Sequence, residues 1–586
     1  MTGINVALAA LPLLLAGVLL VGFLWPATRA MPLAWVAAIV IGYTAWNMPI
    51  NWLAAASGVG VMTAIEILWI VFGALVLLYT LMEAGAFDRI NRGFATVSDD
   101  RRVQIVLIAF FMATFIEGAA GFGTPAAVVA PLLLGLGFPA LAAVVAAIIG
   151  HIIAVTYGAV GTPIVVGIQS PLEDVAFTRE AIEAGGMTVQ AFSREVAAWA
   201  ATYHALVGFV MPLFAVGMVV YFFGDKEDRS LAPAWEVAPL CLASGIAFAV
   251  PYWISAWYLT AEFPSLIGSM VGGAIILSIL RAGYLLPDDE WEFPEREQWA
   301  DHWVGSIEPG QSNGSNGDAE SRGGVSPEAK TADLSSGEDM SLLKAWSPYI
   351  LLVFLLVVTR AVGPISDFIN RDIFIVSWGD ILGTTLSGSV AWMNVPGFWL
   401  LVSAVLAIPI FGMSGKEVSD AWKEAGRKIV SPFIALVFVI AMVQVMLQSG
   451  AHPGAPEVGS MIVLLAQTTA NALGVAYPAI AALIGALGAA MAGSNTVSNI
   501  TFGAFQFEAA TQLGLPRTII VGAQAVGGAI GNLVAIHNLV AALATVGLLG
   551  QEGRVMRLNL IPLLYYATGV GLLCLLFSYV LFPNVF

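Results

Sequence analysis

The sequence predicts an all-α polytopic membrane protein with roughly 12–14 transmembrane helices, arranged as two inverted repeats with broken helices or re-entrant hairpins. Three observations lead to this fold class: an apolar composition, many long apolar runs, and polar breaks at matching places in the two halves. The chain of 586 residues is 59% hydrophobic and 11% charged, with a mean hydropathy of +0.87. Soluble proteins carry about 25% charged residues. This composition excludes a soluble enzyme, because so much apolar surface cannot be buried in one water-facing globule.

The apolar runs account for the predicted number of spans. A helix needs about 20 apolar residues to cross the hydrocarbon core of a bilayer. The runs lie at 5–24, 31–49, 62–84, 103–116, 139–157, 200–223, 236–260, 263–283, 345–363, 396–412, 431–449, 476–493, 518–536 and 558–583. The first run is longer than the apolar core of a secretion signal, and no Lys or Arg precedes it. We therefore interpret it as the first membrane helix.

The chain divides into two membrane halves joined by a polar segment. Residues 1–284 form the first half, and residues 343–586 form the second. The segment 285–342 contains 14 acidic and 3 basic residues and is rich in Gly and Ser in its middle part. Such a composition cannot bury enough apolar surface to offset the entropy lost on ordering. We therefore expect 285–342 to be a disordered acidic linker.

Loop charges and internal similarity predict the orientation of the halves. The loops 85–102 and 412–430 carry four basic residues each, which predicts that both are cytoplasmic and that the N-terminus is outside. Helix 62–84 leads into a basic loop, whereas its similar counterpart 431–449 leaves one. The two helices are therefore expected to cross in opposite directions, as in the inverted repeats of secondary transporters.

The repeat cores are expected at about 62–168 and 431–549. An LGL turn closed by a nearby Pro, followed by a similar Gly pattern, recurs in both cores. Chance similarity between apolar helices is the alternative. Glu66 lies at the start of the predicted helix 62–84, where we expect it to face the headgroup water.

Four segments rich in Gly, Pro and polar residues interrupt the apolar runs: EGAAGFGTP (117–125), TYGAVGTP (156–163), AGSNTVSN (492–499) and AIHN (535–538). Irregular backbone cannot face lipid, because each unpaired N–H or C=O group costs several kcal/mol. Two breaks in each half therefore predict a binding site near the middle of the membrane. The alternative is helix packing through glycine, with Ser and Thr bonded to their own helices.

The breaks supply groups that suit an organic anion. A helix that begins at a break presents free N–H groups and the positive end of its dipole, which attract a carboxylate. Glycines let the backbone approach the ligand, and hydroxyl, amide and imidazole groups add hydrogen bonds. The predicted substrate-binding residues are Gly118, Gly121, Gly123, Thr124, Ser494, Asn495, Thr496, Asn532, His537 and Asn538.

Three titratable residues are candidates for proton coupling. Glu117 follows an apolar run, and an ionisable group at membrane depth is costly and usually functional. His151 and His537 lie in corresponding helices of the two halves, and histidine can exchange a proton near neutral pH. The alternative for Glu117 is a carboxyl fixed by a helix N-terminus or by a basic partner, and the alternative for His151 and His537 is a structural hydrogen bond. For His204, in the run 200–223, we favour a packing role.

The sequence predicts neither an enzyme nor a cofactor or metal site. It contains no HExxH, GxSxG or P-loop pattern, and Cys241 and Cys574 both lie in apolar runs. No basic patch suggests a nucleic-acid partner. The expected partners are a small organic anion, a proton and the lipid bilayer; the oligomeric state is left open.

With these residues in view, the chain resembles the L-lactate permease family of 2-hydroxy-monocarboxylate transporters. The resemblance rests on FIEGAAGFGTP (115–125), AGSNTVSNITFGAFQFE (492–508), LGLPRTIIVGAQAVGGAIGN (513–532) and AIHNLVAALATVGL (535–548). It implies a multi-pass protein of the cell membrane that imports L-lactate with protons, with glycolate or D-lactate as further substrates. Sodium-coupled transport or exchange of another short organic anion is the alternative, and a membrane-embedded enzyme is less favoured.

Overall fold

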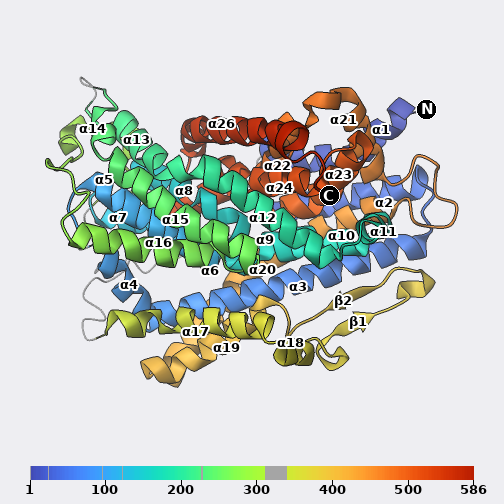
Figure 1. Ribbon diagram of the computed structural model, residues 1–586, viewed down its shortest axis with the longest axis horizontal. Coiled ribbons are helices and arrows are strands. Elements are labelled where there is room, and N and C mark those ends of the chain that lie inside the picture. The colour runs from blue at the N-terminus through green and yellow to red at the C-terminus, as the bar shows by residue number, and fades with distance from the viewer. Residues whose placement is uncertain (1, 24, 96, 122, 226–228, 310–339) are drawn as a thin grey trace.

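The computed structural model is a helical bundle in which the axes of most long helices are roughly aligned (Figure 1). It describes all residues except 1, 24, 96, 122, 226–228 and 310–339. Among the described residues, 12 helices are long and apolar enough to cross a membrane, or up to 13 with the bent pair Arg517–Val534 and Ile536–Thr545. The predicted all-α polytopic fold is thereby confirmed. The only strands in the described part are β1 (Val376–Trp378) and β2 (Gly388–Val390), an antiparallel pair with Ser377 opposite Ser389.

The helices of the first half are α1 (Thr2–Gly17), α2 (Ala27–Thr44), α3 (Ile50–Glu83), α4 (Ala86–Ala95), α5 (Arg101–Gln104), α6 (Ala113–Ala119), α7 (Thr124–Gly135), α8 (Ala140–Gly150), α9 (Gly158–Ile164), α10 (Ser170–Asp174), α11 (Ala176–Ala184), α12 (Val189–Val207), α13 (Met211–Phe223), α14 (Ala232–Glu236), α15 (Ala238–Tyr258) and α16 (Pro264–Arg281). Short stretches of π or 3₁₀ helix extend several of them, including η2 (Ile105–Met112), η3 (Ile152–Tyr157) and η4 (Val165–Gln169).

The helices of the second half are α17 (Leu342–Ala361), α18 (Gly363–Ile369), α19 (Pro396–Phe411), α20 (Gly415–Gln448), α21 (Met461–Leu473), α22 (Tyr477–Ala492), α23 (Asn495–Leu513), α24 (Arg517–Ile530), α25 (Ile536–Thr545) and α26 (Glu552–Leu576), with the 3₁₀ turn η11 (Gly531–Val534) between α24 and α25.

Helices α3, in the first half, and α20, in the second half, are the longest intact helices of the described part, and they pack against each other in opposite directions. Each has 34 residues, which corresponds to about 50 Å of helix. A Cβ on Gly60 would lie 2.5 Å from Cα of Ala441, so glycine allows this close approach. Tyr79, towards the other end of α3, interacts electrostatically with Glu424, near the start of α20. Since these contacts pair opposite ends of the two helices, α3 and α20 are antiparallel.

Both helices extend beyond the predicted boundaries. Residues 50–61, which precede the predicted run 62–84, are the first part of α3, because their small apolar residues continue the helix. Most of the basic loop 412–430 is the first part of α20, which begins with a capping box between Ser414 and Glu417. These two side chains satisfy backbone N–H groups at the helix start, so the basic segment continues as helix.

The order of elements recurs in the two halves. In the first half α6 is followed by a break, α7, a turn, α8, η3 and α9; in the second half α22 is followed by a break, α23, a turn, α24, η11 and α25. The antiparallel packing of α3 and α20 is the arrangement that an inverted repeat predicts. The opposite orientation of the two repeats in the membrane stays a prediction.

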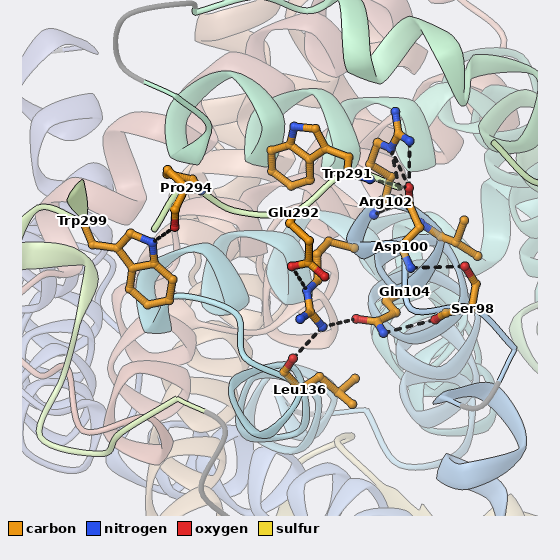
Figure 2. Close-up of polar contacts among 11 residues, drawn as sticks. Ser98, Asp100, Arg102, Gln104, Leu136, Trp291, Glu292, Pro294 and Trp299 are labelled. Atoms are coloured by element: carbon orange, nitrogen blue, oxygen red, sulfur yellow. Dashed lines mark hydrogen bonds and ion pairs between the residues drawn. The ribbon is translucent and has the colours of Figure 1, made fainter. Parts of the chain in front are cut away.

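Part of the predicted linker is ordered, which corrects the expected disorder for 285–309. Trp291 N–H donates to Asp100 Oδ2 at 2.9 Å, and Glu292 forms an ion pair with Arg101 at 2.8 Å (Figure 2). Trp303 is 4% exposed. The prediction of disorder relied on the acidic composition and did not consider the four aromatic side chains of this stretch. These side chains pack on the end of the bundle. Residues 310–339 of the predicted linker lie outside the described residues.

Candidate functional site

The four predicted breaks surround a cavity of about 30 Å³. Its size suits a ligand of few atoms, and its wall combines exposed backbone with polar side chains. The lining residues are Glu117, Gly121, Gly123, His151, Val155, Gly158, Ala159, Pro163, Gly493, Ser494, Asn495, Thr496, Asn532 and Asn538. Elements far apart in the sequence therefore meet at one place.

The first break supplies a helix N-terminus. Helix α6 ends at Ala119 and α7 begins at Thr124. Gly121 and Gly123 have φ of 59° and 77°, in the left-handed region that favours glycine. Gly123 caps α7 without a side-chain hydrogen bond to its first N–H groups. Among the first three positions of α7, Thr124 N–H donates to the carbonyl of Gly121 at 3.1 Å and Pro125 has no N–H, so Ala126 N–H is the remaining donor for an anion.

The second break is a strained turn in the segment 158–161. Ala159, Val160 and Gly161 all have positive φ, of 42°, 55° and 77°. Left-handed backbone costs roughly 1–2 kcal/mol for each non-glycine residue, and such strain persists only where the surroundings hold it. Thr162 Oγ1 donates to the carbonyl of Ala159 at 2.6 Å. A Cβ on Gly161 would lie 2.3 Å from the carbonyl oxygen of Ala261. The turn therefore packs closely against the backbone that precedes α16.

An ion pair fixes the segment on which this turn rests. Glu262, next to Ala261, pairs with Arg360 at 3.1 Å, and Arg360 also donates to Asn394 Oδ1 at 2.8 Å. Both ends of the pair are largely buried. Arg360 therefore anchors the backbone beside the second break.

Glu117 places a carboxyl group in the cavity wall without a partner. Its side chain is 4% exposed, and it has no hydrogen bond or ion pair with the described residues. A Cβ on Gly158 would lie 2.3 Å from Glu117 Oε1. Glycine at 158 therefore makes room for this carboxyl group, and Glu117 is the one acidic residue among those that line the cavity.

His151 lies in the same wall and has one ring nitrogen occupied. Its Nδ1 is 2.6 Å from the carbonyl oxygen of Ala147. Because a carbonyl can only accept, Nδ1 must carry the hydrogen and donate it. Nε2 is then the ring nitrogen that can accept or release a further proton.

The third break carries an amide with an unused acceptor. Ser494 caps α23, and Asn495 is its first residue. Asn495 Nδ2 donates to the carbonyl of Val155 at 3.5 Å, whereas its Oδ1 is buried without a hydrogen-bond partner. A Cβ on Gly528 would lie 2.0 Å from this Oδ1. Asn495 thus links the two halves and leaves one acceptor for a ligand.

The fourth break adds two linked amides and a histidine. Asn538 Nδ2 donates to Asn532 Oδ1 at 2.7 Å. Asn538 Oδ1 lies 3.0 Å from the position of a Cβ on Gly123, so the fourth break touches the first. His537 packs on Gly493, with Nδ1 at 3.3 Å from its Cβ position, and this Nδ1 is buried without a partner.

Three of the predicted site residues do not line the cavity. Gly118 packs on Ser265 and Leu266 of α16, so its small size serves helix packing. Thr124 begins α7 outside the lining, and His537 packs against Gly493, which lies between it and the cavity.

His204 is buried and has a partner on each ring nitrogen. Its Nε2 lies 2.8 Å from Thr156 Oγ1, and its Nδ1 contacts Tyr566 OH. These contacts are consistent with a structural role for His204.

Five lining residues were not among the predicted ones: Val155, Gly158, Ala159, Pro163 and Gly493. All but Val155 lie within the predicted breaks 156–163 and 492–499. Their side chains carry no donor, acceptor or charge, so residue chemistry did not distinguish them. The described residues contain no group of three or more His, Cys, Asp or Glu side chains that could hold a metal ion.

Comparison with known proteins identifies the family. The family model for L-lactate permease matches residues 5–581. The chain belongs to the L-lactate permease family. Curated relatives include the "Putative L-lactate permease" of Haemophilus influenzae, 27% identical over 96% of both chains. The glycolate permease GlcA of Escherichia coli is 26% identical over 93% of this chain and 90% of the relative.

A third relative, the L-lactate permease of Bacillus subtilis, is 26% identical over 89% of this chain and 87% of its own. The family is one of permeases, so this member of the L-lactate permease family is a multi-pass membrane transporter and not an enzyme. A small organic anion is its class of substrate.

Proposed function

We propose that this member of the L-lactate permease family imports L-lactate, with glycolate or D-lactate as further substrates, together with protons across the cell membrane. The observation that supports this most is the small polar cavity at which four broken helices meet. The names of the relatives support both lactate and glycolate as substrates. The basic segments 85–102 and 412–430 support a cytoplasmic location for these segments and an N-terminus outside.

The ends of the broken helices suit the carboxylate of the substrate. The first N–H groups of α7 lack a side-chain cap, and α23 begins at the same cavity. Helix N-termini stabilise an anion through these groups and through their dipoles. A 2-hydroxy acid also carries a hydroxyl group, which can donate to the unpartnered Oδ1 of Asn495. Asn532 and Asn538 also line the cavity.

Glu117 makes anion binding depend on a proton. An ionised Glu117 would repel a substrate carboxylate about 4 Å away by roughly 4 kcal/mol at an effective dielectric constant near 20. A proton on Glu117 removes this repulsion. The anion and one proton therefore bind together, and their combined charge is zero. His151, in the same wall, is placed to pass the proton on.

Uptake of labelled lactate into liposomes that contain the purified protein tests the proposal. An inward proton gradient should accelerate uptake, and unlabelled lactate and glycolate should compete. Glu117→Gln removes the titrating group and keeps the shape, so this variant should exchange lactate without dependence on pH. Glu457→Gln, which changes an exposed carboxyl outside the cavity, is the matched control and should keep the wild-type pH dependence.

Three results would count against the proposal. Uptake driven by a sodium gradient alone would replace the proton with sodium. Uptake that occurs only in exchange for an internal anion would indicate an exchanger. An unchanged pH dependence in Glu117→Gln would remove Glu117 from the coupling mechanism.

A further inference from the structure

A second cavity, of about 360 Å³, lies between α4, α16, α17 and the segment η2–α6 that leads to Glu117. Its wall is almost entirely hydrocarbon. Among the lining residues, only Ser269 and Trp346 carry an N–H or O–H group in the side chain. The hydroxyl of Ser269 donates to the carbonyl of Ser265 in its own helix at 2.7 Å. The part of a ligand that fills this cavity is therefore expected to be apolar.

The cavity is a groove that extends along α16 and opens at the surface of the bundle. Met270, Gly273, Ala274 and Leu277 line it from α16. This spacing places them on one face of the helix, over about 10 Å. The two small residues in the middle leave space between the two larger ones. Leu343 of α17 lies in the opposite wall and is 72% exposed. A narrow chain of methylene groups suits this shape.

One end of the groove lies at an end of the bundle. A Cβ on Gly118 would lie 3.0 Å from the backbone nitrogen of Leu266, and a Cβ on Gly273 would lie 3.5 Å from Phe111. These contacts show that α16 runs antiparallel to η2–α6. Its last residue, Arg281, therefore lies towards the start of α5. Figure 1 shows this end of α16 on the same side as α4 and the start of α17, at the left of the view.

Cations are present at this end of the groove. Arg281 follows Leu277 by one turn on the same face of α16, and Lys344 lies in the first turn of α17. Both side chains are exposed, and neither has an ion pair with the described residues. Arg89 of α4 lies beside them, because its Nε donates to the carbonyl of Met340, just before α17, at 2.8 Å. Lys and Arg side chains near a membrane surface attract anionic lipids.

We propose that this groove binds an anionic phospholipid, with one acyl chain in the apolar part and the phosphate near Arg281 and Lys344. The inference does not depend on the transported substrate or on proton coupling. The bound chain packs on Phe115, whose ring centroid lies 4.5 Å from that of Trp346. Phe115 precedes Glu117 by two residues in α6. The lipid therefore contacts the helix that carries the carboxyl group of the first cavity.

Binding of lipids to the purified, delipidated protein tests the proposal. Native mass spectrometry compares phosphatidylglycerol with phosphatidylcholine that has the same acyl chains, and the wild type should bind one phosphatidylglycerol more tightly. The double variant Arg281→Gln with Lys344→Gln should lower this preference roughly 30-fold. Arg554→Gln with Arg557→Gln, two exposed changes on α26 away from the groove, is the matched control. Glycerol 3-phosphate, which has a phosphate and no acyl chain, should not compete.

Fluorescence quenching locates the acyl chain. Phosphatidylglycerol with brominated chains should quench Trp346, so Trp346→Phe should remove this part of the quenching. Ala274→Phe fills the groove with a larger apolar side chain and should prevent the same quenching. Val250→Phe, an equally large change at an exposed position of α15 outside the groove, should leave it unchanged.

Four results would overturn the inference. Equal binding of the two lipids would show that the headgroup charge is not recognised. A preference that persists in the double variant would place the anion elsewhere. Quenching that is unchanged in both Trp346→Phe and Ala274→Phe would place the acyl chain outside the groove. Conversion of a dimer to a monomer by Ala274→Phe would assign the groove to a second copy of the chain. Because Arg281 and Lys344 are exposed, their double variant should unfold at the wild-type temperature, which keeps the binding test decisive.

Discussion

Substitution of Gly158 by Ala should displace the Glu117 carboxyl group and little else. The added Cβ would lie 2.3 Å from Glu117 Oε1 and 3.5 Å from the backbone oxygen of Glu117. The second distance is an ordinary contact, whereas the first is too short by about 1 Å for two nonbonded atoms in contact. Gly158 has φ of −62° and ψ of 155°, which alanine adopts without strain. The side chain of Glu117 must therefore rotate away, and the backbone can stay.

The expected loss lies in transport more than in stability. Displacement of a reacting group by about 1 Å can lower a rate by roughly 100-fold, and we expect a loss of this order in lactate uptake driven by a pH gradient. Overpacking at a flexible side chain costs about 1–3 kcal/mol at most. Gly150→Ala provides a contrast, because its Cβ would lie 1.9 Å from the backbone oxygen of Ala109 and should prevent folding. Gly135→Ala has no atom within 4 Å of its Cβ and should behave as wild type.

Labelled-lactate uptake in liposomes, together with thermal unfolding in detergent, separates these outcomes. The double variant Glu117→Ala with Gly158→Ala tests the cause, because two changes that act through one contact are not additive. Once the carboxyl is removed, Gly158→Ala should cause no further loss of transport. The reasoning is refuted if Gly158→Ala transports lactate at the wild-type rate with the wild-type pH dependence, or if it unfolds as readily as Gly150→Ala.

Two further substitutions test the cavity and the ordered part of the linker. Asn495→Ala removes an unpartnered acceptor and should raise the KM for lactate about tenfold. Asn370→Ala, at the exposed position that follows α18, should leave the KM unchanged. Equal KM values for the two variants would exclude Asn495 from binding. Arg102→Leu leaves a buried carboxylate unpaired, because the Arg102–Asp100 pair at 2.7 Å is 1% exposed on both sides. It should lower stability by about 3–5 kcal/mol, whereas loss of the exposed Arg296 should cost less than about 1 kcal/mol; comparable unfolding midpoints would contradict this.

The breaks could be predicted from the sequence because lipid restricts the backbone so strongly. Breaks made of glycine, proline and polar residues are tolerated at membrane depth only inside the protein or around a cavity. The breaks 117–125 and 492–499 lie around a shared cavity. The roles of individual glycines could not be predicted in the same way. Gly118 and Gly121 are three residues apart, yet one packs on α16 and the other lines the cavity. Gly118 lies within α6, whereas Gly121 follows the end of this helix in left-handed backbone, and the exact end of the helix could not be predicted from the sequence.

Glu66 shows where sequence analysis failed for a physical reason. The predicted helix began at residue 62, which placed Glu66 near a helix start in contact with headgroup water. In the structure Gly60 allows α3 to pack on Ala441, and the helix begins at Ile50. Glu66 therefore lies in the middle of the helix. The acidic residues that interact with it, Glu173 and Asp174, lie on α10, which no local pattern could connect to it.

The hydrogen bond between Asp174 and Gln444 relates the cavity to the long helices. Asp174 belongs to the helical segment that continues from Pro163 in the cavity wall, whereas Gln444 belongs to α20, which packs against α3. The contact of 2.9 Å between Gln444 Nε2 and Asp174 Oδ2 therefore joins a segment of the cavity wall to the long helices beside it.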